Sequence, residues 1–120
     1  QLATTLSYDS TLKIQSEHIT LGVILLDSQH GVLGFKRLFD GNILSASFYR
    51  REVIKAALNA NASVVITTHY RSNHDLEPGG TDKALIKGLK TALEAVHVQL
   101  LDHLVIGGGE SVSFAERRLL

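Results

Sequence analysis

The chain has 120 residues, which is enough for one domain around a single hydrophobic core. Its 12 basic and 12 acidic side chains give a net charge of zero, so the overall charge does not support nucleic acid binding. It has no cysteine, which excludes disulfides, thiolate zinc sites and cysteine catalysis, and none of its apolar runs approaches the roughly 20 residues of a membrane span.

The N-terminal sequence QLATTLSYDS lacks the basic and then apolar pattern of a signal peptide. Together with the absence of cysteine, this leads us to expect a cytoplasmic protein that does not associate with a membrane. The chain has no methionine, and therefore no start residue of its own, so we expect a fragment of a longer protein.

The start of the chain predicts an arm followed by a hairpin. Residues 1–18 are polar and weakly patterned, and we interpret them as an N-terminal arm that precedes a domain over residues 19–120. Residues 19–27 and 32–39 are apolar runs separated by the turn sequence DSQHG. Two such runs around a turn predict a β-hairpin.

A first helix is expected within residues 45–62. Ser45 or Ser47 can cap it, since a serine hydroxyl satisfies a free N–H group of the first turn. Apolar residues recur at helical spacing and predict the stripe that faces the core, namely Val53, Ile54, Ala57 and Leu58.

A buried strand is expected over residues 63–67, followed by a polar loop. The loop leads into a second helix over residues 82–96, which Thr81 is expected to cap. The apolar stripe of this helix is predicted to comprise Leu85, Leu89, Ala92, Leu93 and Val96.

Two further strands are expected over residues 98–107 and 111–114, with a glycine turn between them. Phe114 and the last two leucines are expected to close the core. The resulting order, β-β-α-β-α-β-β, predicts an α/β fold of the α+β sandwich type, in which strands and helices share one core.

The loop between the third strand and the second helix carries most of the residues suited to chemistry. His69 falls at the end of the strand and Asp82 in the first turn of the helix. Zinc takes nitrogen and oxygen ligands tetrahedrally, so these two side chains can share one ion. A catalytic zinc needs a third protein ligand, for which His74, Asp75 and Glu77 are the candidates in the loop.

An alternative without metal also accounts for these residues. A histidine at a strand end is commonly hydrogen-bonded, and an aspartate at a helix start commonly caps it. Arg71 favours this alternative, because a fixed positive charge close to His69 repels a divalent cation unless a carboxylate such as Asp75 or Glu77 neutralises it.

Asp102 and His103 lie side by side on the fourth predicted strand. A histidine paired with a carboxylate could serve in acid–base chemistry. The favoured interpretation is structural, with both side chains satisfying polar groups inside the fold.

Two long stretches, DGNILSASFYRREVIKAALNANASVVITTH and LLDHLVIGGGESVSFAERRLL, resemble the RadC family. This family comprises bacterial members of the JAB/MPN (JAMM) metalloprotease fold, and the resemblance covers residues 19–120. It implies a cytidine-deaminase-like mixed sheet flanked by helices. Members usually carry a helix-hairpin-helix region before this domain, which the sequence does not contain.

The family's site motif reads H-x-H-x7-S-x2-D, and the chain matches it in part. The first histidine corresponds to His69 and the aspartate to Asp82, whereas Arg71 stands at the second histidine and Gly79 at the serine. The resemblance implies that the two histidines and the aspartate of active relatives bind zinc. An arginine cannot replace a ligand, because it does not deprotonate in proteins.

Active relatives of this fold also carry a glutamate before the first strand, which serves as general base. The gapless alignment places Ile19 there, and Glu17 lies two residues earlier. A shift of two residues moves a side chain roughly 6.6 Å along a strand. The base is therefore displaced or lost.

These departures favour a RadC-like JAB/MPN domain of the zinc metallopeptidase or isopeptidase fold whose metal site is degraded. Such a domain would act in binding or assembly, with a protein or peptide partner and without metal. The first alternative is an active zinc-dependent hydrolase that uses His69, His74 and Asp82 as ligands and Glu17 as base. The second is a DNA-repair-associated binding module, which the neutral net charge does not support.

Overall fold

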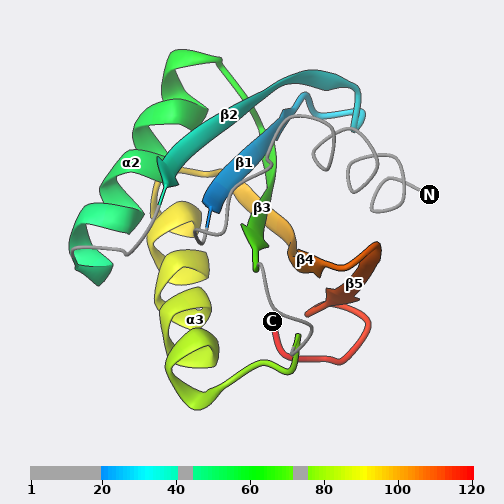
Figure 1. Cartoon of the computed structure of the whole chain (residues 1–120). Coiled ribbons are helices and arrows are strands. Elements are labelled where there is room, and N and C mark those ends of the chain that lie inside the picture. Colours follow the sequence, from blue (N-terminus) through cyan, green and yellow to red (C-terminus); the bar gives the residue numbers. More distant parts are fainter. Residues whose placement is uncertain (1–19, 41–44, 72–75) are drawn as a thin grey trace.

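The structure is a computed structural model, and it describes residues 20–40, 45–71 and 76–120 (Figure 1). The N-terminal arm expected over residues 1–18 lies outside the described residues. The described elements follow the predicted order of strands and helices.

The described strands form one five-stranded mixed sheet in the order β2-β1-β3-β4-β5. β1 runs antiparallel to β2 and to β3, β3 and β4 are parallel, and β4 and β5 are antiparallel. The expected α+β architecture and the β1–β2 hairpin are thus confirmed. The strands are β1 (Thr20–Leu26), β2 (Val32–Asp40), β3 (Val64–Tyr70), β4 (Gln99–Gly107) and β5 (Glu110–Ser113).

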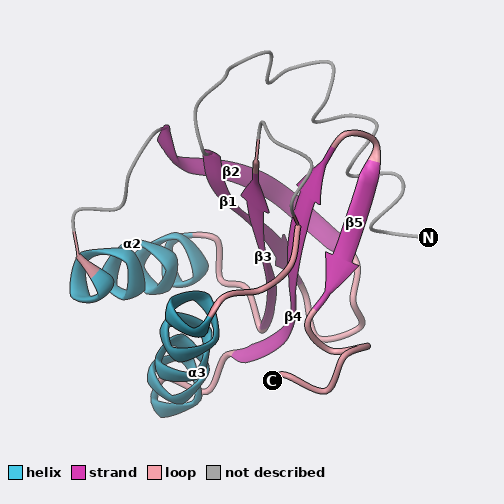
Figure 2. Cartoon of the chain, turned by 60° about the horizontal axis from the view of Figure 1, so that its bottom comes forward, coloured by secondary structure: helices cyan, strands magenta, loops and turns pink. Residues whose placement is uncertain are grey.

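Both described helices, α2 (Ala46–Asn59) and α3 (Gly80–Ala95), lie side by side against one face of the sheet (Figure 2). Ser45 caps α2, because its hydroxyl accepts a hydrogen bond from the N–H of Phe48 at 3.1 Å. One of the two predicted caps is therefore confirmed.

The predicted cap of α3 is wrong. Gly79 is the N-cap residue, and Thr81 lies one residue inside the helix. The helix begins directly after Gly79, which has no side chain to act as a cap, and the carboxylate of Asp82 accepts a hydrogen bond from the N–H of Gly79 at 3.4 Å.

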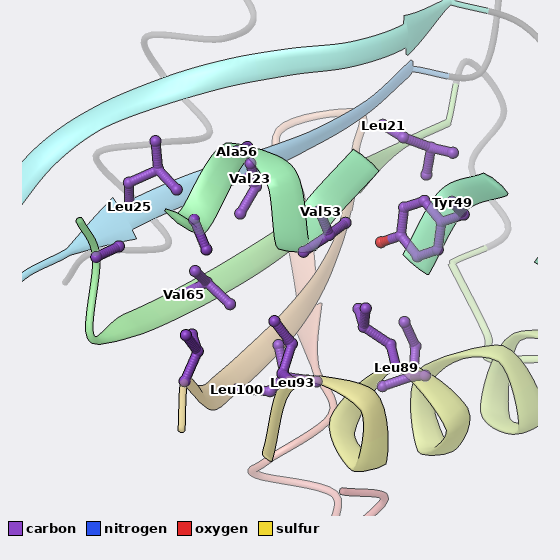
Figure 3. Close-up of a cluster of buried hydrophobic side chains, with 14 of the residues drawn as sticks. Leu21, Val23, Leu25, Tyr49, Val53, Ala56, Val65, Leu89, Leu93 and Leu100 are labelled. Carbon is purple, nitrogen blue, oxygen red and sulfur yellow. The ribbon is translucent and has the colours of Figure 1, made fainter. Parts of the chain in front are cut away.

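The main core lies between the helices and the sheet (Figure 3), where Leu21, Val23 and Leu25 of β1 meet the two helices. The helix faces were predicted only in part. Leu58 is 56% exposed, because α2 is turned so that a different set of side chains meets the sheet. The buried residues of α2 are Tyr49, Val53, Ala56 and Ala57, and those of α3 are Ile86, Leu89 and Leu93.

The opposite face of the sheet is also apolar and buried. Its side chains alternate along the strands with those of the main core, as the period of two requires. They are Ile24, Leu26, Val64, Ile66, Tyr70, Leu104 and Ile106. Neither described helix is long and apolar enough to cross a membrane.

The connection from β3 through α3 to β4 positions the candidate site. The third strand ends at Tyr70 and the helix begins at Gly80, so the end of the strand and the first turn of the helix lie at the same edge of the sheet (Figure 1). Arg71, directly after the strand, and Asp82, in the helix, meet at this edge although they are 11 positions apart in the sequence.

Candidate functional site

His69 is the penultimate residue of β3 and pairs with Leu21 of β1 and Val105 of β4. Its side chain is 8% exposed, and its Nε2 atom has no hydrogen-bond partner among the described residues. Burial lowers the pKa of His69 to about 4, with Asp82 opposing this shift and Arg71 adding to it. The imidazole is therefore neutral at pH 7.

Arg71 extends the hydrogen bonding of β3 by one residue, since its N–H donates to the carbonyl of Ile106 at 2.9 Å. Alternate residues of a strand share a face, so its side chain emerges on the same side as that of His69. It meets Asp82 of α3, and Arg71 Nη2 donates to Asp82 Oδ2 at 2.6 Å. Both side chains are partly buried, at 18% and 19% exposure.

This ion pair engages one oxygen of the carboxylate that the sequence assigned to a metal. Arg71 donates to Oδ2, whereas no described group donates to Oδ1. Asp82 also accepts a hydrogen bond from the N–H of Gly79. Asp82 is thus a partner of Arg71, a role for which Asp75 and Glu77 were the candidates from the sequence.

The described residues do not fit a resident zinc ion. Nowhere in residues 20–40, 45–71 and 76–120 do three histidine, aspartate or glutamate side chains converge as a ligand set. The structure brings together two of the predicted site residues, His69 and Asp82, and places the Arg71 guanidinium against the aspartate. The other two, His74 and Glu17, lie outside the described residues.

Glu77 is engaged elsewhere in the loop region. Its carboxylate accepts a hydrogen bond from Arg117 at 2.9 Å, and both side chains are exposed. This contact links the loop before α3 to the C-terminal segment.

A second buried histidine, His103, lies on the strand next to that of His69. His103 of β4 is 2% exposed, and its Nδ1 atom is 2.6 Å from the hydroxyl of Thr67. Its ring centroid is 6.3 Å from that of His69 and 4.9 Å from that of Phe114, which it meets edge-on. Burial lowers the pKa of His103 to about 3, with smaller contributions from His69 and Arg71.

Asp102 does not act as the partner of the His103 ring. Its carboxylate accepts hydrogen bonds from the N–H of His103 at 2.7 Å, the hydroxyl of Ser113 at 2.6 Å and the N–H of Ala115 at 2.9 Å. It therefore holds the end of β5 against β4. The structural interpretation of Asp102 and His103 is confirmed.

Two pairs were not predicted from the sequence, Arg71 with Asp82 and Thr67 with His103. The alternation of side chains along β3 places Thr67, His69 and Arg71 on the face toward the helices, and this periodicity was the available signal. The identity of each partner depends on the path of the connecting loop, which spacing does not specify.

The mixed sheet with both described helices on one face agrees with the JAB-like α+β fold that the resemblance implied. The model of the RadC-like JAB domain matches residues 2–119. The chain belongs to this family.

Curated relatives carry the name UPF0758 protein. The relative from Vibrio cholerae serotype O1 is 48% identical over 101 residues, which cover 84% of this chain and 63% of the relative. That from Saccharophagus degradans is 50% identical over 103 residues, covering 86% of this chain and 45% of the relative. The relative from Halorhodospira halophila is 43% identical over 118 residues, which cover 98% of this chain and 53% of the relative. The chain thus spans about half the length of the curated relatives it matches.

Proposed function

We propose that the chain is a non-catalytic RadC-like JAB domain, in which the Arg71–Asp82 ion pair takes the place of a metal ion, and that it serves as a binding module for a protein or peptide partner. The contact that carries this proposal is the 2.6 Å hydrogen bond between the guanidinium and the carboxylate.

Electrostatics supports the proposal. A guanidinium keeps its charge at every physiological pH and has no lone pair to offer a metal. A zinc ion bound to Asp82 would lie next to the Arg71 guanidinium, whether it displaced the ion pair or used the other carboxylate oxygen. Two like charges a few ångströms apart in a partly buried environment repel strongly, so the guanidinium disfavours zinc binding.

The chemistry that would remain without metal is limited. Hydrolysis of an amide bond in this fold requires a Lewis acid and an activated water. His69 is buried and neutral and hydrogen-bonds to no described group through Nε2. Gly79 offers no hydroxyl at the position of the family's serine, so it supplies no side-chain donor for a developing oxyanion.

An active zinc-dependent hydrolase of amide or isopeptide bonds is the second candidate. The observation in its favour is the unpartnered Nε2 atom of His69, since a buried imidazole nitrogen without a partner is uncommon. This candidate requires His74 as third ligand, Glu17 as base, and Arg71 turned away from Asp82.

Zinc content separates the two candidates. We would remove loosely bound metal and measure zinc per chain by elemental analysis in the wild type, Asp82→Ala and Arg71→His. We expect no stoichiometric zinc in the wild type or in Asp82→Ala. Arg71→His restores the H-x-H pattern of the family and should bind about one zinc per chain.

Arg71→Lys is the matched control, because it keeps the positive charge and should bind no zinc. The double variant Arg71→His with Asp82→Ala should lose the zinc gained by the single change. About one zinc per chain in the wild type, lost in Asp82→Ala, would contradict the proposal and establish the loop as a metal site.

A further inference from the structure

A groove lies between the N-terminal ends of α2 and α3, next to the turn that carries Asp82. It encloses about 780 Å³. The two helices that form its walls pack side by side on one face of the sheet (Figures 1 and 2). One side of the groove is lined by the N-cap residue Ser45 and by Ala46 and Arg50 of α2. The other side is lined by Thr81, Ala84 and Leu85 of α3.

Arg50 is the charged side chain among the described residues that line this groove. Its Nη1 atom lies 3.4 Å from the position that a Cβ on Gly88 of α3 would take, so the guanidinium reaches across to the second helix. Its Nη2 atom donates a long hydrogen bond, 3.4 Å, to the hydroxyl of Ser47. Within the described part of the chain, Arg50 pairs with no carboxylate.

The helix ends add positive charge to the same groove. The first N–H groups of a helix have no partner within it, and the helix dipole makes this end positive. α2 has no acidic residue in its first turn. The acidic residue of the first turn of α3, Asp82, is engaged by Arg71 and by the N–H of Gly79. The start of α2 therefore has no carboxylate beside it, although the Ser45 hydroxyl satisfies one of its N–H groups, whereas Asp82 compensates the start of α3 in part.

The remaining lining is apolar or small. Ala46, Ala84 and Leu85 form a surface that an aliphatic side chain can cover. The Arg50 guanidinium beside this apolar surface suits a ligand in which a carboxylate is next to an aliphatic group. It does not match a nucleic acid backbone, which binds through several cations spaced along its phosphates.

We propose that this groove binds an acidic peptide segment of a partner protein, with a carboxylate against Arg50 and the start of α2 and a neighbouring apolar side chain against Ala46, Ala84 and Leu85. The inference rests on the proposed binding function and names the chemical class of its partner.

The test is a titration followed by amide chemical shifts. The probe is a pool of N-acetylated, C-amidated hexapeptides with glutamate at the third position, leucine at the fourth and the other positions randomised. We expect shift changes at Ala46, Thr81 and Leu85. The pool with glutamine in place of glutamate should bind at least about tenfold more weakly, because the charge pair is lost.

Variants locate the binding. Arg50→Glu should weaken binding of the glutamate pool at least about tenfold. Ala84→Phe should abolish it by filling the groove. Arg51→Glu is the matched control, since it makes the same charge change on an exposed neighbour outside the groove and should alter binding less than about twofold.

The absence of shift changes at the groove with the glutamate pool would overturn the proposal, and so would equal binding by Arg50→Glu and the wild type. Neither result bears on the zinc measurement, which involves no groove residue. A zinc-free protein that ignores the peptides would refute the groove alone, whereas stoichiometric zinc would refute the proposed function whatever the peptides do.

Discussion

Two imidazoles lie in the layer between the sheet and the helices, and their environments differ in one respect. His103 has a hydroxyl partner, Thr67, at 2.6 Å, whereas Nε2 of His69 has no described partner. Burial is the largest cause that lowers the pKa of both. Protonation of either ring would place a second positive charge close to Arg71, which already carries one.

This burial makes stability depend on pH. In the unfolded chain both histidines titrate near pH ~6.5. In the folded chain their pKa values are about 4 for His69 and about 3 for His103. As the pH falls from 7 to 5 the unfolded state takes up protons that the folded state does not. The stabilisation is therefore complete above about pH 6.5 and is lost progressively toward pH 4 and below.

We expect the free energy of unfolding, measured by urea denaturation, to fall by about 2 kcal/mol between pH 6 and pH 5, since each proton contributes about 1.36 kcal/mol per pH unit. His103→Gln should remove about half of this slope. The matched change at an exposed histidine, His97→Gln, should leave it unaltered. Equal stability at pH 5 and pH 7 would show that the rings are not buried as neutral groups.

At the scale of elements, the start of α2 has a defined cap. Ser45 is extended and its hydroxyl accepts from the N–H of Phe48, whereas Ser47 lies inside the helix. A capping side chain accepts a hydrogen bond from a backbone N–H that otherwise has no partner in the helix, so it stabilises the first turn of the helix.

We expect Ser45→Ala to lower the free energy of unfolding by about 1 kcal/mol in urea denaturation. Ser47→Ala is the control and should cost less than about 0.5 kcal/mol, because its hydroxyl makes one long contact with Arg50. If the two substitutions cost the same, Ser45 does not cap the helix in solution.

At the scale of the whole molecule, the C-terminal segment returns to the core. Phe114 is fully buried, and its ring meets that of His103 edge-on. Its N–H donates to the carbonyl of His103 at 3.0 Å, and its carbonyl accepts from the N–H of Leu119 at 2.8 Å. Leu119 and Leu120 pack against the same core, as expected from sequence.

We expect Phe114→Ala to lower the free energy of unfolding by about 3–5 kcal/mol, through lost burial and the cavity that remains. This is a large part of the roughly 5–15 kcal/mol that stabilises a typical domain. Leu58→Ala is the control and should cost less than about 0.5 kcal/mol, because Leu58 is 56% exposed. Comparable losses would mean that the C-terminal segment is not part of the cooperative core.

The order of strands and helices could be predicted because each element carries its own period of apolar residues. The faces of the helices that meet the sheet could not be predicted exactly. Leu58 fits a helical stripe as well as Ala56 does, and the choice between them depends on how α2 is rotated against the sheet. Thr81 resembles a cap, but the chain enters the helix two residues earlier, at Gly79.

The candidate site was predictable to a similar degree. His69 and Asp82 lie where the sequence places them, at the strand end and in the first helical turn. The pairing of Asp82 with Arg71 was not foreseen, because the sequence shows which charges are present and not which of several carboxylates a loop brings to a guanidinium. The family resemblance indicated a missing ligand without indicating what compensates for it.

The Arg71–Asp82 pair has a consequence for how the domain depends on its surroundings. In a metal-held site, the junction between a strand and the following helix weakens when the ion is scarce. Here the counterion is part of the polypeptide, so it is present in every copy from synthesis onward and no chelator can extract it. Under the proposed function, the shape of this corner therefore does not depend on the supply of trace elements in the cell.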